Sequence, residues 1–349
     1  MYIYIVLFVL TVVCCFFEYN YSSMKIVNHK IKVRNIVATI LMVFFLLIGV
    51  LRNELLGVDV KIYKEMFFYN YEWKELLTNF SFDNGYFLLC KIFKLFSSDF
   101  YLFKSFIYIV TFYLYYVSVI KKSKYVSISL LIFLGLTRLE GMFCVFRQEI
   151  AIAICFFATK YVYKNPKLFI LIILLASTIH KTALFYLIIL FFNENKFKKI
   201  NKLKMMLLGI SSLIFMIFLL PFVTKLYLND YSSLLRYDGG LNLLILFILN
   251  YIVISFFRKK SLDREINIYY KIFTISIFMQ MISLRFSLFT RITNYFSLSL
   301  SLIYPDVISR VNKKTGNCIL VLLVVEFGFL FFYSLNLGLT QIVPYIFNF

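Results

Sequence analysis

Residues 138–187 read RLEGMFCVFRQEIAIAICFFATKYVYKNPKLFILIILLASTIHKTALFYL, and this stretch decides how the chain folds. Most of it is apolar enough to lie in a lipid bilayer. It nevertheless carries seven polar or charged side chains at or near membrane depth, namely Arg138, Glu140, Arg147, Gln148, Glu149, His180 and Lys181. An arginine at the centre of a membrane helix costs about 2.5–3.5 kcal/mol, so such groups normally face a cavity or a partner. The stretch therefore predicts membrane helices that enclose a polar site.

The composition of the whole chain indicates an integral membrane protein. Of its 349 residues, 62% are hydrophobic and 15% are charged, whereas soluble domains carry about 45–50% apolar and about 25% charged residues. The net charge of +20 does not predict nucleic-acid binding, because the basic residues form short clusters between apolar runs, as cytoplasmic loops do. The six cysteines lie in or beside apolar runs without metal-ligand spacing, so we expect neither disulfides nor a metal site.

The alternation of apolar runs and basic clusters predicts an all-α, polytopic helical bundle that forms one domain, 1–349, with about 12 membrane segments. We expect the run at 1–17 to be a first membrane helix rather than a signal peptide. The loops at 52–84 and 223–240 lack a basic excess and are expected outside the cytoplasm. The other expected membrane segments are 36–51, 100–120, 125–137, 141–163, 205–222, 241–257, 267–284, 289–308 and 318–335.

Three segments depart from this regular alternation. Residues 85–96 would span only about 18 Å as a helix, against about 30 Å of hydrocarbon, so we expect a re-entrant or interfacial helix. Residues 168–192 form either one helix or two short legs that meet near His180. We favour two legs, which keep the lysines that follow in the cytoplasm, and broken backbone is tolerated where it lines a cavity. Aromatic side chains among charges in 52–84 predict interfacial helices.

The basic side chains left on the outward side come from five segments and include Arg138, Arg147, Lys181, Lys225, Arg236, Arg285 and Arg291, joined by His180. Their convergence at one membrane face predicts an anionic ligand. Alternatives stay open: Arg147 could pair with Glu140 or Glu149 and only hold helices together. His180 could be a satisfied interior histidine, and Arg138 an anchor at the membrane surface. The chain lacks a glycine-rich phosphate loop, an HExxH sequence and a serine nucleophile elbow, which argues against nucleotide hydrolysis and metalloprotease chemistry.

Six short motifs follow one another along the chain. They are Gly49-Val-Leu-Arg52 with Gly57-Val-Asp59 and Tyr63; Asn84-Gly85-Tyr86; Phe146-Arg147-Gln148 with Ala151; Ala176 to His180 with Lys181-Thr182-Ala183-Leu184; Arg291 with Tyr295-Phe296; and Pro344-Tyr345. In this order they resemble the EpsG-like group of Wzy-type polysaccharide polymerases, with Thr182 where that group has serine and Asp83 near its usual glutamate. The resemblance covers nearly the whole chain.

The resemblance implies an all-helical enzyme of the bacterial cytoplasmic membrane that needs no metal, nucleotide or other cofactor. It would join undecaprenyl-diphosphate-linked oligosaccharide repeat units into an O-antigen, capsule or exopolysaccharide at the extracytoplasmic face. A flippase and a chain-length regulator of the same pathway would be its partners. Two other functions share the same substrate chemistry: a flippase of the lipid-linked oligosaccharide, and a ligase that moves finished glycan to another acceptor.

For the polymerase we expect Arg147 and Arg291 to stabilise the diphosphate leaving group, because a guanidinium offers planar, permanently charged donors to phosphate. His180 would accept the proton of the acceptor hydroxyl, a role that an external carboxylate such as Asp59 could also fill. These three catalytic residues would be assisted by substrate-binding residues, namely Arg52, Asp59, Gln148, Lys181, Arg236 and Arg285.

Overall fold

The computed structural model describes residues 1–21, 33–69, 72, 84–192, 240–257 and 264–348, and every regular element in these ranges is helical. In chain order the α-helices are α1 (Tyr2–Tyr21), α2 (Val33–Val50), α3 (Val60–Phe68), α5 (Asn84–Lys94), α6 (Phe100–Lys122), α7 (Val126–Gly135), α8 (Arg138–Cys144), α9 (Phe146–Ala158), α10 (Pro166–Ile179), α13 (Leu241–Phe257), α14 (Arg264–Ser283), α15 (Leu288–Ser297), α16 (Leu300–Arg310) and α17 (Lys313–Leu337). Two 3₁₀ helices join them, η1 (Thr159–Tyr161) and η2 (Lys181–Phe192).

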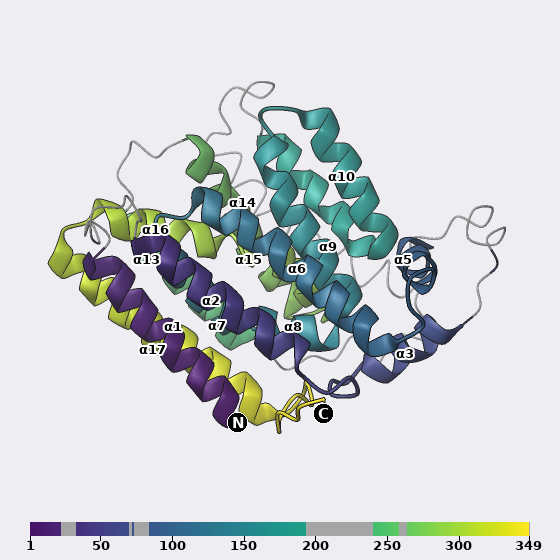
Figure 1. Cartoon of the computed structure of the whole chain (residues 1–349). Coiled ribbons are helices and arrows are strands. Elements are labelled where there is room, and N and C mark those ends of the chain that lie inside the picture. Colours follow the sequence, from purple (N-terminus) through teal and green to yellow (C-terminus); the bar gives the residue numbers. More distant parts are fainter. Residues whose placement is uncertain (22–32, 70–71, 73–83, 193–239, 258–263, 349) are drawn as a thin grey trace, which may run out of the picture.

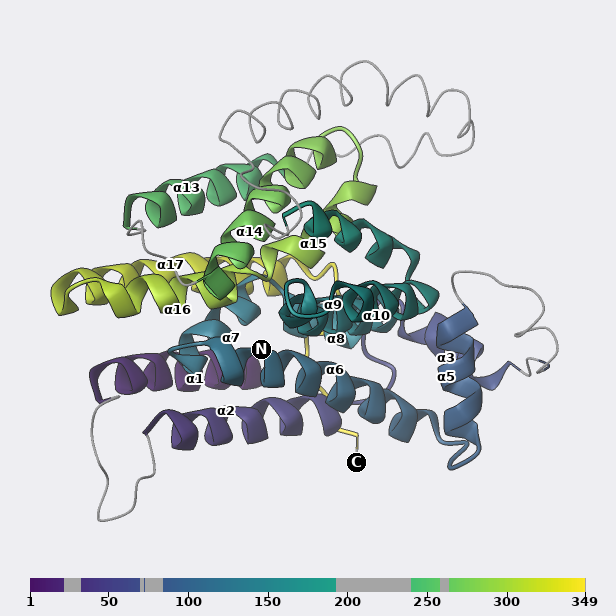
Figure 2. The same cartoon turned by 90° about the horizontal axis from the view of Figure 1, so that it is seen from above.

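Four long helices, α1, α2, α6 and α17, are apolar enough to cross a membrane, and the bent pair α7–α8 makes a fifth if it counts as one span. The four long helices run along one another in the two views of Figures 1 and 2. The described part of the chain is thus that of a helical membrane protein. It holds fewer full spans than the expected total of about 12, so that number stays a prediction, as does the single domain.

The helix α7 lies at the centre of the bundle. All ten of its residues are buried, and it packs against α1, α16 and α17. A helix that is apolar on every side lies either in lipid or in a protein core, and the burial of α7 places it in the core. The broken elements that follow α7 are therefore anchored to a fixed core.

Several membrane segments are broken rather than continuous. The axis bends by 59° between α7 and α8. The expected single helix at 141–163 is wrong, because the chain leaves helical geometry at Val145, with φ −116° and ψ 59°, between α8 and α9. The expected break at His180 is confirmed: α10 ends there in extended backbone, and η2 leads away from it. The segment expected at 289–308 is likewise divided into α15 and α16.

The long loop at 52–84 is described in part. Its helix α3 buries Val60, Tyr63 and Phe67 on one side, as an interfacial helix would. The expected short helix at 85–96 is present as α5. The C-terminal segment covers this end of the bundle, where Asn53 N–H donates to Ile346 O at 2.8 Å. The segment expected at 205–222 and nearly all of the loop 223–240 lie outside the described residues.

Candidate functional site

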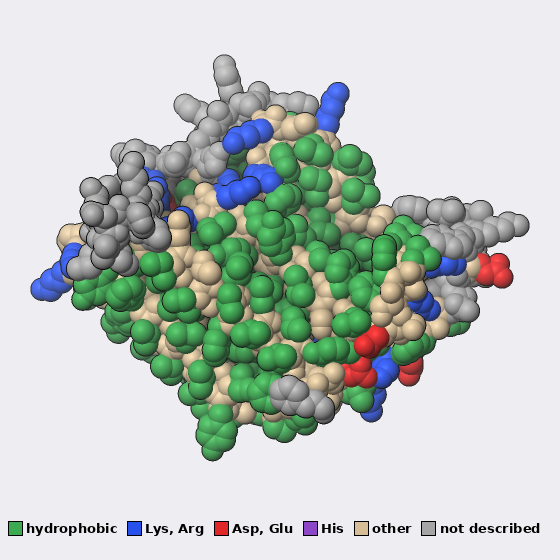
Figure 3. Space-filling model, in the orientation of Figure 1, with side chains coloured by type: hydrophobic (Ala, Val, Ile, Leu, Met, Phe, Trp, Pro, Cys, Tyr) green, Lys and Arg blue, Asp and Glu red, His purple; other side chains and the backbone are tan. Residues whose placement is uncertain are grey.

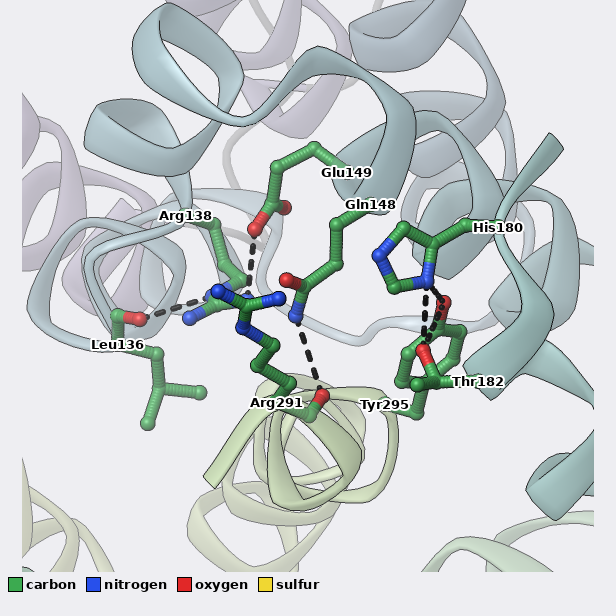
Figure 4. A network of polar contacts seen from close by, with 8 residues as sticks. All are labelled: Leu136, Arg138, Gln148, Glu149, His180, Thr182, Arg291 and Tyr295. Carbon is green, nitrogen blue, oxygen red and sulfur yellow. Dashed lines mark hydrogen bonds and ion pairs between the residues drawn. The ribbon is translucent and has the colours of Figure 1, made fainter. Parts of the chain in front are cut away.

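The breaks at Val145 and His180 and the start of α15 bring polar side chains from distant parts of the chain together (Figure 4). We call the side chains drawn there the polar cluster, which comprises Arg138, Gln148, Glu149, His180, Thr182, Arg291 and Tyr295. They lie on α8, α9, the α10–η2 junction and α15, so the cluster depends on how these elements pack.

A buried ion pair forms one side of the polar cluster. Arg138 Nη1 lies 2.8 Å from Glu149 Oε1, with the two side chains only 5% and 4% exposed. Arg138 Nε also donates to Leu136 O at 2.8 Å. The alternative of an arginine anchored at the membrane surface is therefore wrong. A Cβ at Gly141 would lie 2.3 Å from Glu149 Oε1, so the absence of a side chain there lets the carboxylate reach Arg138.

Arg291 enters the polar cluster from the first turn of α15. The Gln148 side-chain amide donates to Arg291 O at 3.1 Å and so ties the first turn of α9 to α15. The Arg291 side chain is itself exposed, and in Figure 4 its guanidinium points toward the place where Arg138 and Glu149 meet. The positive charge of Arg291 is thus directed toward the Arg138–Glu149 ion pair, which has no net charge.

His180 is held by two hydroxyl groups. Thr182 Oγ1 lies 2.7 Å from His180 Nδ1 and donates to Tyr295 Oη at 3.2 Å. Because a hydroxyl carries one proton, a threonine that donates to the tyrosine accepts from Nδ1–H of the histidine. We therefore assign the proton of neutral His180 to Nδ1 and the lone pair to Nε2.

Arg147 lies at the start of α9 and contacts the residue before His180. Its Nε donates to Ile179 O at 3.3 Å, and its guanidinium carbon is 5.6 Å from the centre of the Tyr86 ring. Burial raises the pKa of Tyr63 on α3, Asp59 raises it further, and Arg147 and Arg291 lower it. The charges of both arginines thus act on one phenol.

The alternative in which Arg147 pairs with Glu140 or Glu149 is wrong. Glu149 is engaged by Arg138, and Glu140 accepts hydrogen bonds from Ser334 Oγ at 2.9 Å and Thr340 Oγ1 at 3.1 Å. The two carboxylates therefore hold other elements together, and α17 and the C-terminal segment are among them.

Other predicted site residues lie apart from the polar cluster. Arg52 is 1% exposed, and its guanidinium donates to Leu56 O and to Phe143 O, the latter at 3.1 Å. Its backbone pairs with Phe347 through a β-bridge. This position supports a structural role instead of substrate binding. Asp59 is half-buried just before α3. Lys181 and Arg285 are exposed, and no hydrogen bond or ion pair among the described residues joins either side chain to the cluster. Arg236 lies outside the described residues.

Sequence reasoning missed the roles of four residues in the polar cluster: Arg138, Glu149, Thr182 and Tyr295. Two opposite charges at membrane depth in adjacent apolar runs were a usable signal for the ion pair, since such charges need partners. Nothing in the local sequence signals that Tyr295 meets Thr182, because 113 residues separate them.

The geometry of the cluster suits an anionic ligand and a proton transfer. Arg291 offers an exposed guanidinium, and Nε2 of His180 is assigned the lone pair. Arg147, outside the cluster, adds a half-buried guanidinium that contacts Ile179 O. Within the described ranges no three His, Cys, Asp or Glu side chains gather as metal ligands would. Independence from metals stays a prediction.

Comparison with known proteins gives one match. Residues 35–347 match the family model described as the EpsG family, which is nearly the whole chain. No curated protein and no solved structure matches the chain significantly.

Proposed function

The chain belongs to the EpsG family, which makes it a membrane protein of polysaccharide biosynthesis, and we propose that it polymerises lipid-linked oligosaccharide repeat units. The donor is a glycan chain on undecaprenyl diphosphate, and the acceptor is the non-reducing end of another lipid-linked unit. The reaction takes place at the extracytoplasmic face of the bacterial cytoplasmic membrane. A flippase that delivers the units and a chain-length regulator are the proposed partners.

One observation carries this proposal: Arg147, His180 and Arg291 lie on elements that hydrogen bonds tie together where membrane helices are broken. The His180 hydroxyl contacts and the Gln148–Arg291 hydrogen bond fix the elements that carry them. Broken helices at membrane depth are tolerated where they line a cavity or a protein interior. A site of this kind suits a substrate whose reacting group lies at the end of a lipid.

The leaving group determines what the arginines do. As the anomeric carbon–oxygen bond to the diphosphate breaks, negative charge develops on the phosphate oxygens. Guanidinium groups fixed in advance stabilise that charge without reorganisation, and removal of one such donor typically costs about 2.7–4 kcal/mol of barrier. We assign this role to Arg147 and Arg291.

The histidine completes the proton balance. The acceptor hydroxyl attacks the anomeric carbon, a new glycosidic bond forms, and the hydroxyl proton passes to Nε2 of His180. The proton then leaves for the diphosphate or for water, and undecaprenyl diphosphate is released. Thr182 keeps the proton on Nδ1 and so leaves Nε2 as the acceptor.

The charges of the polar cluster favour a polymerase over a flippase. A flippase for a diphosphate lipid needs cationic lining through both halves of the membrane. Here the buried Arg138 is neutralised by Glu149, and the exposed arginine of the cluster is Arg291. A ligase shares the donor chemistry and differs only in its acceptor.

Deletion of the protein followed by glycan sizing tests the proposal. Single repeat units should still reach the cell surface or accumulate on lipid, and long chains should disappear. Persistence of long polymer in a strain without a second polymerase would contradict the proposal. A complete absence of repeat units at the outer face would favour the flippase.

A further inference from the structure

The helices α3 and α5 lie side by side at one end of the bundle (Figures 1 and 2). In Figure 3 charged side chains gather over this end, at the edge of a broad hydrophobic face. The two helices pack on the start of α9 in a hydrophobic cluster that is separate from the main core and includes Tyr63, Tyr86 and Phe146. The turn that carries Arg147 is thus covered by elements at the edge of the apolar surface.

Of the three residues that α3 buries, only Tyr63 carries a polar group. Its ring stacks on that of Phe146, with the centroids 4.8 Å apart and the planes at 20°. It also lies 5.6 Å from the ring of Tyr86. The guanidinium carbon of Arg147 is 5.6 Å from the centre of the same Tyr86 ring. The Tyr63 phenol and the Arg147 guanidinium therefore share one aromatic neighbour.

The Tyr63 hydroxyl accepts a hydrogen bond, but no residue in the described ranges accepts one from it. Its donor is the backbone N–H of Arg147, in the first turn of α9. Burial raises the pKa of this hydroxyl and Asp59 raises it further, by more than Arg147 and Arg291 lower it, so the phenol keeps its proton at neutral pH. Polar groups in protein interiors are nearly always paired, and the Tyr63 O–H is thus available to a ligand.

We infer that Tyr63 is a third hydrogen-bond donor to the diphosphate of the lipid-linked substrate, beside Arg147 and Arg291. The inference rests on the proposed function and adds a residue to its site. The charges of both arginines act on the Tyr63 hydroxyl, so an anion that binds the two guanidinium groups would lie next to it. The O–H donates to a phosphate oxygen and the proton stays on the phenol, so no covalent bond changes. The rings of Phe146 and Tyr86 fix this donor in advance, as stabilisation of developing charge requires.

Equilibrium binding to the purified protein tests the inference. The full chain in neutral detergent is titrated with radiolabelled undecaprenyl diphosphate and, in parallel, with undecaprenol, which has the same tail and no charge. Tyr63→Phe keeps the ring and should bind the diphosphate about ten- to hundredfold more weakly, because a hydrogen bond to a charged group is lost. Its affinity for undecaprenol should be unchanged. Only protein that elutes as one folded species is titrated, so a lower yield does not count as a lower affinity.

Two comparisons separate direct contact from a role in folding. Tyr101→Phe removes a different hydroxyl, which donates to Val50 O at 2.7 Å, and this variant should bind the diphosphate as the parent does. An equal loss of affinity in Tyr101→Phe and Tyr63→Phe would overturn the inference.

In an Arg147→Ala background, Tyr63→Phe should weaken binding further. No further loss there would mean that Tyr63 acts only by holding the start of α9, and it would overturn direct contact with the ligand. Equal affinity of the parent and Tyr63→Phe would overturn the inference and leave the proposed function intact. A parent protein that does not bind undecaprenyl diphosphate would overturn the proposed function, and the inference with it.

Discussion

Replacement of Arg147 separates a role in the reaction from a role in folding. Its contacts include one hydrogen bond to Ile179 O and a cation–π contact with Tyr86. These two contacts contribute about 1–2.5 kcal/mol to the stability of the folded protein. If Arg147 stabilises the leaving diphosphate, Arg147→Ala should slow polymerisation by about 100- to 1,000-fold. The loss of activity should thus far exceed the loss of folded protein.

Arg138 provides the matched control. Arg138→Ala leaves Glu149 buried without its partner, and such a loss destabilises by about 3–5 kcal/mol. We therefore expect Arg138→Ala to reduce the amount of protein in the membrane, with activity falling in proportion. Arg147→Lys should insert normally yet polymerise weakly, because a single ammonium cannot reproduce the bidentate fork of a guanidinium.

The assay measures two quantities in each strain: membrane abundance by immunoblot and glycan length by gel electrophoresis. Normal abundance with short glycan is the expected result for both Arg147 variants. Full-length glycan from a normally abundant Arg147→Ala protein would remove Arg147 from the site. Recovery of both abundance and activity in Arg147→Lys would assign it a structural role.

Three further predictions follow from the same contacts. Thr182→Ser should retain activity. Thr182→Val should lower activity about five- to tenfold and alter its pH profile, because valine cannot fix the tautomer of His180. Equal activity in the two variants would refute the assignment of the His180 proton to Nδ1. Gly141→Ala should reduce abundance, since its Cβ would lie 2.3 Å from Glu149 Oε1, and normal thermal stability of that variant would contradict the close packing. Cysteine at Lys61 should react with an impermeant thiol reagent from outside the cell and cysteine at Lys313 only after permeabilisation, and the opposite pattern would invert the topology.

Sequence periodicity predicted where most helices lie, because the bilayer imposes length and apolarity on each segment. The end of α13 at Phe257 and the break at His180 both agree with the expectation. The break at Val145 was not predictable, since neither proline nor glycine separates Cys144 from Phe146. It depends on tertiary packing that the local sequence does not record.

The candidate site was predictable only as a set of residue types. Charged residues in apolar runs predicted a polar site, but they did not predict which charges neutralise one another. Arg138 and Glu149 meet across the helix break at Val145. In one continuous helix their separation of 11 residues would place them about 16 Å apart along the axis, so the ion pair depends on that break. For Arg52 the sequence predicted substrate binding, because the residue lies in an external loop. In the structure its backbone pairs with Phe347 of the C-terminal segment.

Reconstitution tests the central claim most directly. The purified protein, placed in liposomes with undecaprenyl-diphosphate-linked repeat units from its own strain and no nucleotide sugar, should convert them into a ladder of longer glycans. One undecaprenyl diphosphate should be released for each unit joined, and Arg147→Ala protein should yield almost none. Repeat units that change leaflet without growing in length, with no release of undecaprenyl diphosphate, would contradict the account.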